Sequence, residues 1–231
     1  MAENTNENNE APCLLAVLAH PDDETFGMGG TLAYYARRGV QTYLVCATRG
    51  EAGEIDPHYL DGFASIAERR EHELECAAEK LGLSGVFFLD YRDSGMQGSK
   101  DNAHPRALAG QPVEQVAAEI AEFIRRLRSQ VLVTFDPIGG YRHPDHIAIH
   151  QATVIAFDLA ADASFRDDSN LAPFSAVKFY YQTVPHGFLR LIVRIMQLLG
   201  RELEGRGRGA FNLTCPLRSQ PVADTGTSES P

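Results

Sequence analysis

The chain has 231 residues, of which 44% are hydrophobic, and its 31 acidic side chains outnumber 21 basic ones for a formal charge of -10. This composition suffices for one sizeable core, and the negative charge argues against nucleic acid or an anionic membrane surface as the main partner. No apolar run reaches the length of a membrane-spanning helix, and the polar first residues carry no secretory signal.

Short apolar runs alternate with segments of helical periodicity along most of the chain. The apolar runs predict strands at Cys13–Ala19, Thr42–Ala47, Val86–Leu89, Val131–Phe135 and Val177–Tyr181. The helical patterns cover Gly29–Arg38, Ala64–Leu81, Val113–Arg128, His143–Asp158 and Phe188–Leu199. Strands separated by such helices form βαβ units, so we predict a Rossmann-like, three-layer α/β/α fold with a mostly parallel sheet.

We expect one domain over residues 12–204, with a disordered polar leader at 1–11 and a loose tail rich in Gly, Ser, Thr and Pro at 205–231. The segment Phe188–Leu199 has apolar residues at helical spacing and arginines on another side. We expect this helix to pack on the sheet. A homo-oligomer interface and contact with a membrane are the alternatives.

The four cysteines are scattered along the chain and form no C-x-x-C pair. Two of them, Cys13 and Cys46, lie in strand-like runs, where a reduced thiol behaves as a small hydrophobic group. This pattern is typical of a reduced protein, and we expect the cytoplasm as its location.

Polar side chains cluster directly after four of the predicted strands. The clusters lie at His20–Glu24, Arg49–Glu54, Asp90–Gly95 and Asp136–His146. Because ligands bind at the carboxyl ends of the strands in an open α/β sheet, these clusters predict one shared site. The first cluster contains three adjacent carboxylates, whose mutual repulsion favours a bound cation.

A nucleotide site is one explanation for the glycine-rich turn after the first strand. The turn contains Gly27, Gly29 and Gly30, but Leu32 stands where the G-x-G-x-x-G motif needs its third glycine. Carboxylates also occupy the place where a pyrophosphate would approach the helix. The sequence therefore argues against a nucleotide site.

A metal site explains the histidines and carboxylates better. The first cluster supplies His20 and Asp23, and the segment "HPDHIAIH" supplies further histidines and a carboxylate. Two histidines and one carboxylate that leave a position for water are typical of catalytic zinc, and they also suit Fe²⁺. The spare carboxylate Asp22 could then accept a proton from that water. Taken singly, either aspartate could instead cap the following helix.

These same residues carry a resemblance to a known family. The segments "AHPDDE" (Ala19–Glu24) and "HPDH" (His143–His146) resemble the LmbE-like, or PIG-L, family of zinc-dependent N-deacetylases, which remove acetyl from N-acetylglucosaminyl groups. The similarity extends to "TRGEAG" (Thr48–Gly53), "RREHELECAAEKLG" (Arg69–Gly82) and "LDYRDSGM" (Leu89–Met96). It spans about Leu14 to Tyr181 and fades beyond.

The resemblance implies a role for each matching residue. His20, Asp23 and His146 would bind zinc. Asp22 would act as the general base that later delivers a proton to the leaving amine. His143 would stabilise the developing oxyanion as a charged partner.

Further residues complete the site that the resemblance implies. Asp145 would orient His143 and hold it protonated, Tyr141 would help to polarise the carbonyl, and Glu24 would support the site from behind. Three arginines are candidates for substrate binding, with solvated loop positions as the alternative: Arg49, Arg70 and Arg92. Arg142 departs from the pattern, because relatives often carry glycine there.

The activity that these residues imply is zinc-dependent removal of acetyl from a small-molecule amino-sugar conjugate of the N-acetylglucosamine type. Three alternatives stay open at this point. The chain could be an amidase acting on a larger thiol-conjugate amide, an iron oxygenase, or a metal- or sugar-binding module that has lost catalysis.

Overall fold

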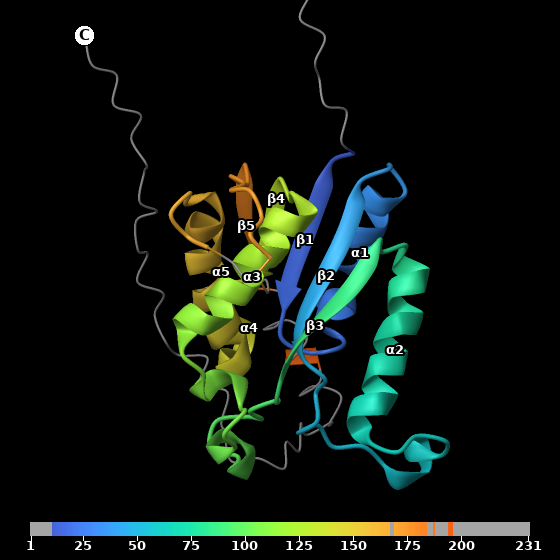
Figure 1. Cartoon of the computed structure of the whole chain (residues 1–231). Coiled ribbons are helices and arrows are strands. Elements are labelled where there is room, and N and C mark those ends of the chain that lie inside the picture. Colours follow the sequence, from blue (N-terminus) through green and yellow to red (C-terminus); the bar gives the residue numbers. More distant parts are fainter. Residues whose placement is uncertain (1–10, 167–168, 184–186, 188–193, 196–231) are drawn as a thin grey trace, which may run out of the picture. The chain divides into compact units, whose positions relative to one another are not determined.

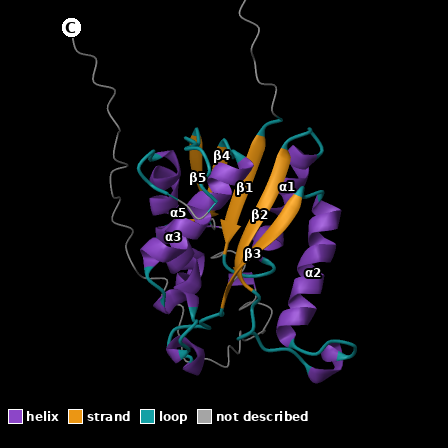
Figure 2. Ribbon diagram, in the orientation of Figure 1, coloured by secondary structure: helices purple, strands orange, loops and turns teal. Residues whose placement is uncertain are grey.

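The computed structural model describes residues 11–166, 169–183, 187 and 194–195 (Figure 1). The strands are β1 (Cys13–Leu18), β2 (Gln41–Thr48), β3 (Gly85–Tyr91), β4 (Val131–Phe135) and β5 (Lys178–Gln182). They form one sheet in the order β3-β2-β1-β4-β5, and each neighbouring pair is parallel (Figure 2). The predicted Rossmann-like α/β fold is confirmed.

Helices cover both faces of this sheet. They are α1 (Asp23–Ala36), α2 (Ile66–Leu81), α3 (Val113–Leu127), α4 (Gly139–Arg142) and α5 (Pro144–Ala161), with short 3-10 helices η1 (Pro57–Leu60), η2 (Lys100–Ala103) and η3 (Leu108–Gly110). The chain moves outward from β1 in both directions, so right-handed crossovers put the two sets of helices on opposite faces. Accordingly, α1 packs with α2, and α3 packs with α5 (Figure 1).

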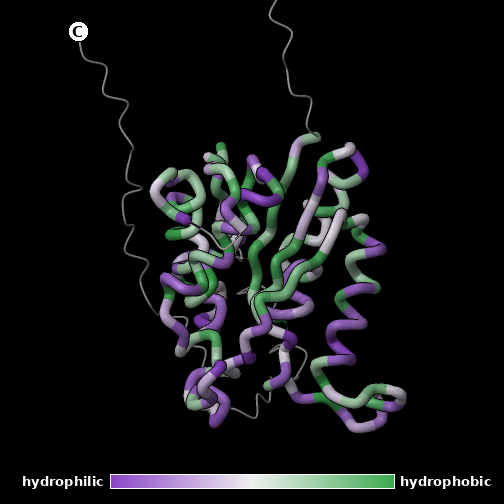
Figure 3. The backbone as a smooth tube through the Cα atoms, in the orientation of Figure 1, coloured by the Kyte–Doolittle hydropathy of each residue, from purple (hydrophilic) through white to green (hydrophobic). Residues whose placement is uncertain are grey.

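The central strands carry the hydrophobic core. Every residue of β1 is buried, and so is the stretch Leu44–Ala47 of β2. Because helices cover both faces of these strands, polar residues do not alternate with apolar ones, as the sequence shows. Figure 3 shows the same strands as hydrophobic beside more hydrophilic helices. Cys13 and Cys46 are buried here as free thiols, in keeping with their expected role as small hydrophobic groups.

Helix α1 begins at Asp23, six residues before the predicted start at Gly29. The glycine-rich sequence suggests a loop, but Gly27 lies inside the helix. A Cβ atom at this position would meet only the flexible end of the Gln182 side chain, so packing does not require glycine here. The earlier start places Asp22 at the N-cap position, beside the positive end of the helix dipole.

The predicted helix His143–Asp158 is two helices in the structure. The single turn α4 is followed by His143 in an extended conformation, and α5 then begins at Pro144. Proline suits this first helical position because its fixed φ matches the helix and its missing N–H is not needed there. Within the irregular turn, Arg142 has a φ of 70°. The other predicted elements among the described residues agree with the structure to within two residues at each end.

The chain divides into two compact units, Met1–Val184 and Pro185–Pro231, and the sheet with its helices belongs to the first. The predicted helix Phe188–Leu199 lies outside the described residues except at Arg194 and Ile195, and so do residues 1–10 of the leader and the whole tail. The domain end at residue 204 therefore stays a prediction. In the described part of the chain, no helix combines the length and the apolar character needed to span a membrane.

Candidate metal centre

The candidate site lies between the carboxyl ends of β1 and β4, where the order of the strands changes direction. His20 follows the end of β1 by two residues. His143 is the N-cap residue of α5, and His146 lies in its first turn. All three histidines are buried. This crevice is the usual ligand-binding place of an open α/β sheet.

Three donor groups face one another at this point. Nε2 of His146 lies 3.3 Å from Nδ1 of His20 and 3.4 Å from Oδ1 of Asp23. Nδ1 of His20 lies 3.5 Å from Oδ2 of Asp23. Ligand atoms held about 2.1 Å from a tetrahedral ion are separated from one another by about 3.4 Å. Asp23 makes the two contacts with different carboxylate oxygens, whereas His20, His143 and His146 each offer one ring nitrogen within 4.8 Å of the others. The described side chains therefore gather enough donors for one divalent cation, with Asp23 and His143 both beside the pair His20 and His146.

His20 is held from its other side by two carboxylates. Its Nε2 lies 3.1 Å from Oδ2 of Asp145 and 3.5 Å from Oδ1 of Asp93. A proton on Nε2 satisfies these contacts and directs the lone pair of Nδ1 toward His146 and Asp23, as in sites where a carboxylate orients a metal-binding histidine. Burial by itself lowers the pKa of His20, but hydrogen bonds to the surrounding carboxylates, Asp145 first, raise this pKa well above its usual value.

His143 belongs to the same cluster but is fixed differently. One of its ring nitrogens lies within 4.8 Å of a ring nitrogen of His20 and one of His146. Its Nδ1 accepts the backbone N–H of Asp145 at 3.2 Å, so the proton of the neutral ring lies on Nε2. Burial, followed by the charge of His20, lowers the pKa of His143. This tautomer suits a hydrogen-bond donor better than a metal ligand.

Asp145 has further partners besides His143, the residue that it was expected to orient. In the described contacts, its carboxylate accepts the backbone N–H of Ser94 at 2.9 Å and the Ser94 hydroxyl, and it contacts His20. The charge of the Asp145 carboxylate opposes the lowering of the His143 pKa, and the backbone N–H of Asp145 donates to the His143 ring. The physical reason is the turn at the start of α5, in which the N-cap side chain accepts this N–H. Asp145 therefore positions His20 through its carboxylate and His143 through its backbone.

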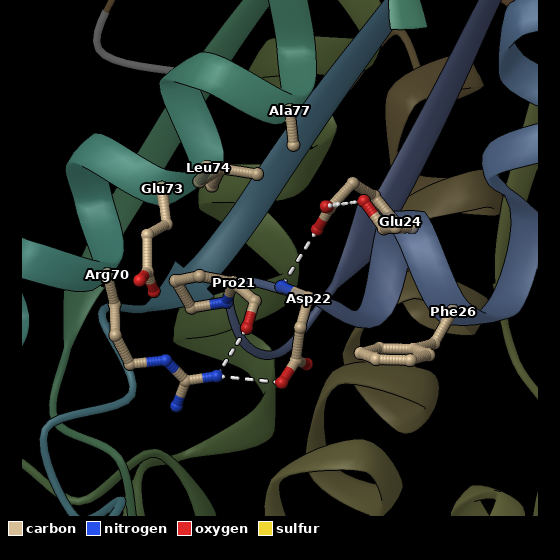
Figure 4. A pocket seen from close by; sticks show the side chains of 9 residues that line it. Pro21, Asp22, Glu24, Phe26, Arg70, Glu73, Leu74 and Ala77 are labelled. Carbon is tan, nitrogen blue, oxygen red and sulfur yellow. Dashed lines mark hydrogen bonds and ion pairs between the residues drawn. The ribbon is translucent and has the colours of Figure 1, made fainter. Parts of the chain in front are cut away.

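Asp22 lies beside the donors with its carboxylate half-exposed. Its φ is 110°, and its side chain makes no capping hydrogen bond to α1. The carboxylate instead accepts a hydrogen bond from Nη2 of Arg70 at 2.9 Å, and the backbone N–H of Asp22 donates to Oε2 of buried Glu24 at 3.0 Å (Figure 4). Burial, then the charge of Asp23, raises the pKa of Asp22 to about 6 against the opposing charge of Arg70. Helix capping therefore does not explain this aspartate.

A pocket of about 220 Å³ opens beside these groups, and Tyr141 lines it together with His20, Asp22 and His143. The ring centroid of Tyr141 lies 6.0 Å from that of His143 and 5.0 Å from that of His146. Burial, followed by the charge of Asp23, raises the pKa of Tyr141 to about 12, so its hydroxyl keeps its proton at neutral pH. Tyr141 is thus available as a second donor at the pocket.

The three arginines proposed for substrate binding differ in their surroundings. Arg70 lines the pocket and also donates to the backbone carbonyl of Gly50 at 3.3 Å. Arg49 forms ion pairs with carboxylates of α2 and β3, and Arg92 pairs with Asp101 at 2.9 Å. Neither of these two lines the pocket. Their surroundings fit the alternative, in which they are structural loop arginines.

Two site residues were not singled out by the sequence analysis. Asp93 lines the pocket, contacts His20 and accepts the backbone N–H of Gly95 at 2.8 Å. Burial by itself raises the pKa of Asp93, but its hydrogen bond to His20 and that histidine's charge lower the pKa well below its usual value. Ser94 is fully buried and binds Asp145. Both residues belong to the polar cluster Asp90–Gly95 after β3. That cluster is the feature of the sequence from which they could have been predicted.

Comparison with known families decides where this chain belongs. The model of the PIG-L family, described as GlcNAc-PI de-N-acetylase, matches residues 15–157, which include every donor of the site. The chain belongs to the PIG-L family. The resemblance seen in the "AHPDDE" and "HPDH" segments is thereby confirmed.

Two curated PIG-L relatives are similar over most of this chain. A 1D-myo-inositol 2-acetamido-2-deoxy-alpha-D-glucopyranoside deacetylase from Kineococcus radiotolerans is 42% identical over 227 residues, which cover 91% of this chain and 61% of the relative. The protein of the same name from Streptomyces scabiei is 39% identical over 217 residues, which cover 90% and 66%. The chain therefore spans less than two thirds of the length of these relatives.

Solved structures share the fold of this PIG-L domain. A conserved protein from Thermus thermophilus is 29% identical with a TM-score of 0.56, over 75% of this chain and 67% of that chain. The N,N'-diacetylchitobiose deacetylase from Pyrococcus horikoshii has a TM-score of 0.60 at 23% identity, over 84% and 72% of the two chains. At this identity the second similarity concerns the fold alone.

Proposed function

We propose that this PIG-L family member is a zinc-dependent hydrolase that removes the acetyl group from an N-acetylglucosamine-type conjugate. The observation that carries the proposal is the close approach of His20, Asp23 and His146. The two ring nitrogens lie 3.3 Å apart, and each lies within 3.5 Å of one carboxylate oxygen of Asp23, near the separation of ligand atoms around a tetrahedral cation. Relatives named as deacetylases of an inositol-linked 2-acetamido sugar support the substrate class.

The chain's own groups prepare these three donors for a metal. The carboxylate of Asp145 fixes the tautomer of His20, and the ring of Phe135 stacks on His146 with centroids 3.8 Å apart and an interplanar angle of 10°. Both contacts hold the imidazole planes in place before a metal binds. A zinc ion at this position would supply Lewis acidity and a bound water that ionises near pH ~7.

Amide hydrolysis needs a group that takes a proton from the attacking water and gives it to the departing nitrogen. Asp22 fits this role because its carboxylate lines the pocket next to Asp23 and Arg70 fixes its orientation. The carboxylate of Glu24 accepts the backbone N–H of Asp22 and so fixes the backbone at this position. Asp22 would therefore carry the proton from water to the amine that leaves.

The acetyl oxygen gains negative charge as water adds to the carbonyl carbon, so donors directed at it lower the barrier. His143 offers its Nε2–H, because Nδ1 is occupied by the N–H of Asp145. Tyr141 offers its hydroxyl from the same pocket. A neutral His143 ring suffices as this donor. The resemblance instead implies a protonated, charged ring.

The test combines metal analysis with turnover. Protein purified without added metal is analysed for zinc and iron and then assayed for amine release from a panel of N-acetylglucosaminides and larger thiol-conjugate amides. We expect zinc near one equivalent and amine release from the acetylated sugars. Zinc binding without turnover of any amide would favour a module without catalysis, and oxygen-dependent turnover with bound iron would favour an oxygenase. The cytoplasmic location stays a prediction that this test does not address.

A further inference from the structure

The pocket of about 220 Å³ beside the histidines is called the catalytic pocket below. A second pocket lies directly beside it, between the first turn of α1 and helix α2 (Figure 4). Its volume is about 330 Å³. The walls include Asp22, Phe26, Arg70, Glu73, Leu74 and Ala77. The steps proposed above for deacetylation need none of the space in this second pocket, which we call the outer pocket.

The walls of the outer pocket combine one aromatic face with a few charged groups. Phe26 is 88% exposed, and Figure 4 shows its ring extending toward the carboxylate of Asp22. Leu74 and Ala77 form an apolar wall on α2. Glu73 adds a carboxylate from the same helix. An aromatic ring left in water next to charged groups is typical of a surface that binds a partly apolar ligand.

The outer pocket and the catalytic pocket share two residues. Asp22 and Arg70 line both, and their 2.9 Å ion pair forms the boundary between the two spaces. A sugar with its acetamido group at the metal donors therefore lies next to the outer pocket, and a substituent on that sugar can cross the boundary. The catalytic pocket, about 220 Å³, is below the usual size of ligand sites, about 300–1,000 Å³, and the outer pocket, about 330 Å³, is at the lower end of that range.

We propose that the outer pocket binds the second ring of the substrate, a sugar or cyclitol joined to the N-acetylglucosamine unit by a glycosidic oxygen. This proposal rests on the proposed function. The C–H face of such a ring packs on Phe26, and its hydroxyls donate to the carboxylate of Glu73 and accept from Arg70. Hydroxyl-rich rings suit this arrangement because they have one apolar face and a polar edge.

The experiment compares two substrates with the zinc-loaded protein. The two-ring substrate is 1D-myo-inositol 2-acetamido-2-deoxy-α-D-glucopyranoside, and the one-ring substrate is methyl 2-acetamido-2-deoxy-α-D-glucopyranoside. The measured quantity is the ratio of their kcat/KM values, two-ring over one-ring. Phe26→Leu should lower this ratio about 2- to 13-fold, the worth of an aromatic contact beyond its buried area. Phe26→Tyr should restore it.

A second variant tests the same space without touching Phe26. Ala77→Phe fills the outer pocket from the opposite wall and should also lower the ratio. Tyr34→Leu is the matched control, because Tyr34 is a 50% exposed aromatic residue on the same helix and lines neither pocket. Its ratio should equal that of the wild type. If Phe26→Leu and Ala77→Phe both leave the ratio at the wild-type value, the outer pocket is not the second-ring site.

A binding measurement separates this proposal from the proposed function. Calorimetry with the two deacetylated amines gives their affinities whether or not the protein catalyses hydrolysis. If the wild type binds the two-ring amine more tightly and Phe26→Leu loses this preference, the outer pocket is supported. If neither substrate is turned over in that case, only the proposed function is overturned. Equal affinities for the two amines overturn the outer pocket even if both substrates are hydrolysed.

Discussion

Ser94 binds both carboxylate oxygens of Asp145: its backbone N–H donates to Oδ2 at 2.9 Å, and its hydroxyl donates to Oδ1. The Ser94 hydroxyl oxygen also accepts the backbone N–H of Ala109 at 3.0 Å. Asp145 in turn contacts Nε2 of His20. A fully buried serine outside the pocket lining thus positions a histidine of the candidate metal centre.

Ser94→Ala should weaken zinc binding without removing any ligand. The variant leaves Oδ1 of Asp145 without its hydroxyl donor, and loss of such an outer partner typically costs about 10- to 100-fold in metal affinity. Titration of zinc against a chromophoric chelator measures the change. Ser129→Ala is the control, because Ser129 is equally buried but contacts Cys13 at the other end of the sheet. Equal zinc affinities in the two variants would contradict the positioning role.

Asp22→Asn should keep zinc and lose turnover by about 10²- to 10⁴-fold, the usual worth of a positioned base. Asparagine is the suitable replacement because it keeps the size of the side chain and tolerates the positive φ of 110° at this position. The measurement pairs zinc content with kcat on an acetylated amino sugar. A variant with full zinc and near-wild-type kcat would remove Asp22 from the proton transfer.

His143→Ala and His146→Ala should have different effects although the two rings lie 5.0 Å apart. His146 faces Asp23 and His20 with its Nε2, so its loss should abolish zinc binding. His143 presents a donor rather than a lone pair, so its loss should spare zinc and lower kcat by about 10²- to 10³-fold. Metal analysis of both purified variants decides. If His143→Ala is the variant that loses zinc, the roles of the two histidines are exchanged.

The fold could be predicted because its central strands are covered on both faces. The strand Cys13–Leu18 then reads as an unbroken apolar run, and its end lies just before the first polar residue, His20. The position of the site followed from the same pattern. The "HPDD" segment begins two residues after the end of β1, and the "HPDH" segment begins at the residue before α5. The start of α1 was missed because Gly27, Gly29 and Gly30 have low helix propensity, which the folded context overrides.

The partners of individual side chains could not be predicted in the same way. Arg49 and Arg70 both lie near strand ends in the folded chain, yet only Arg70 of these two lines the pocket. Arg49 is held by carboxylates from α2 and β3, which the fold brings together from separate parts of the sequence. The same holds for Asp145, whose carboxylate contacts His20 at 3.1 Å from a distant part of the sequence.

Arg142 gives a prediction about stability, because its φ of 70° lies in the region where residues with a Cβ atom are strained. This conformation costs such a residue about 1–2 kcal/mol, while glycine adopts it freely but loses about 0.5–1 kcal/mol of extra chain entropy on folding. Arg142 is exposed, so both substitutions remove the same solvated side chain. Arg142→Gly should therefore exceed Arg142→Ala in free energy of unfolding by about 0.5–1 kcal/mol.

Urea unfolding of the two variants measures this difference, and a pair at Glu75 provides the control. Glu75 is exposed within α2, where the backbone is helical and glycine costs about 1 kcal/mol relative to alanine. The order of stability should thus reverse between the two positions, with glycine better at 142 and alanine better at 75. Alanine equal to or better than glycine at 142 would show that the turn before His143 relaxes out of the left-handed conformation. In that case Arg142 occupies this position without strain.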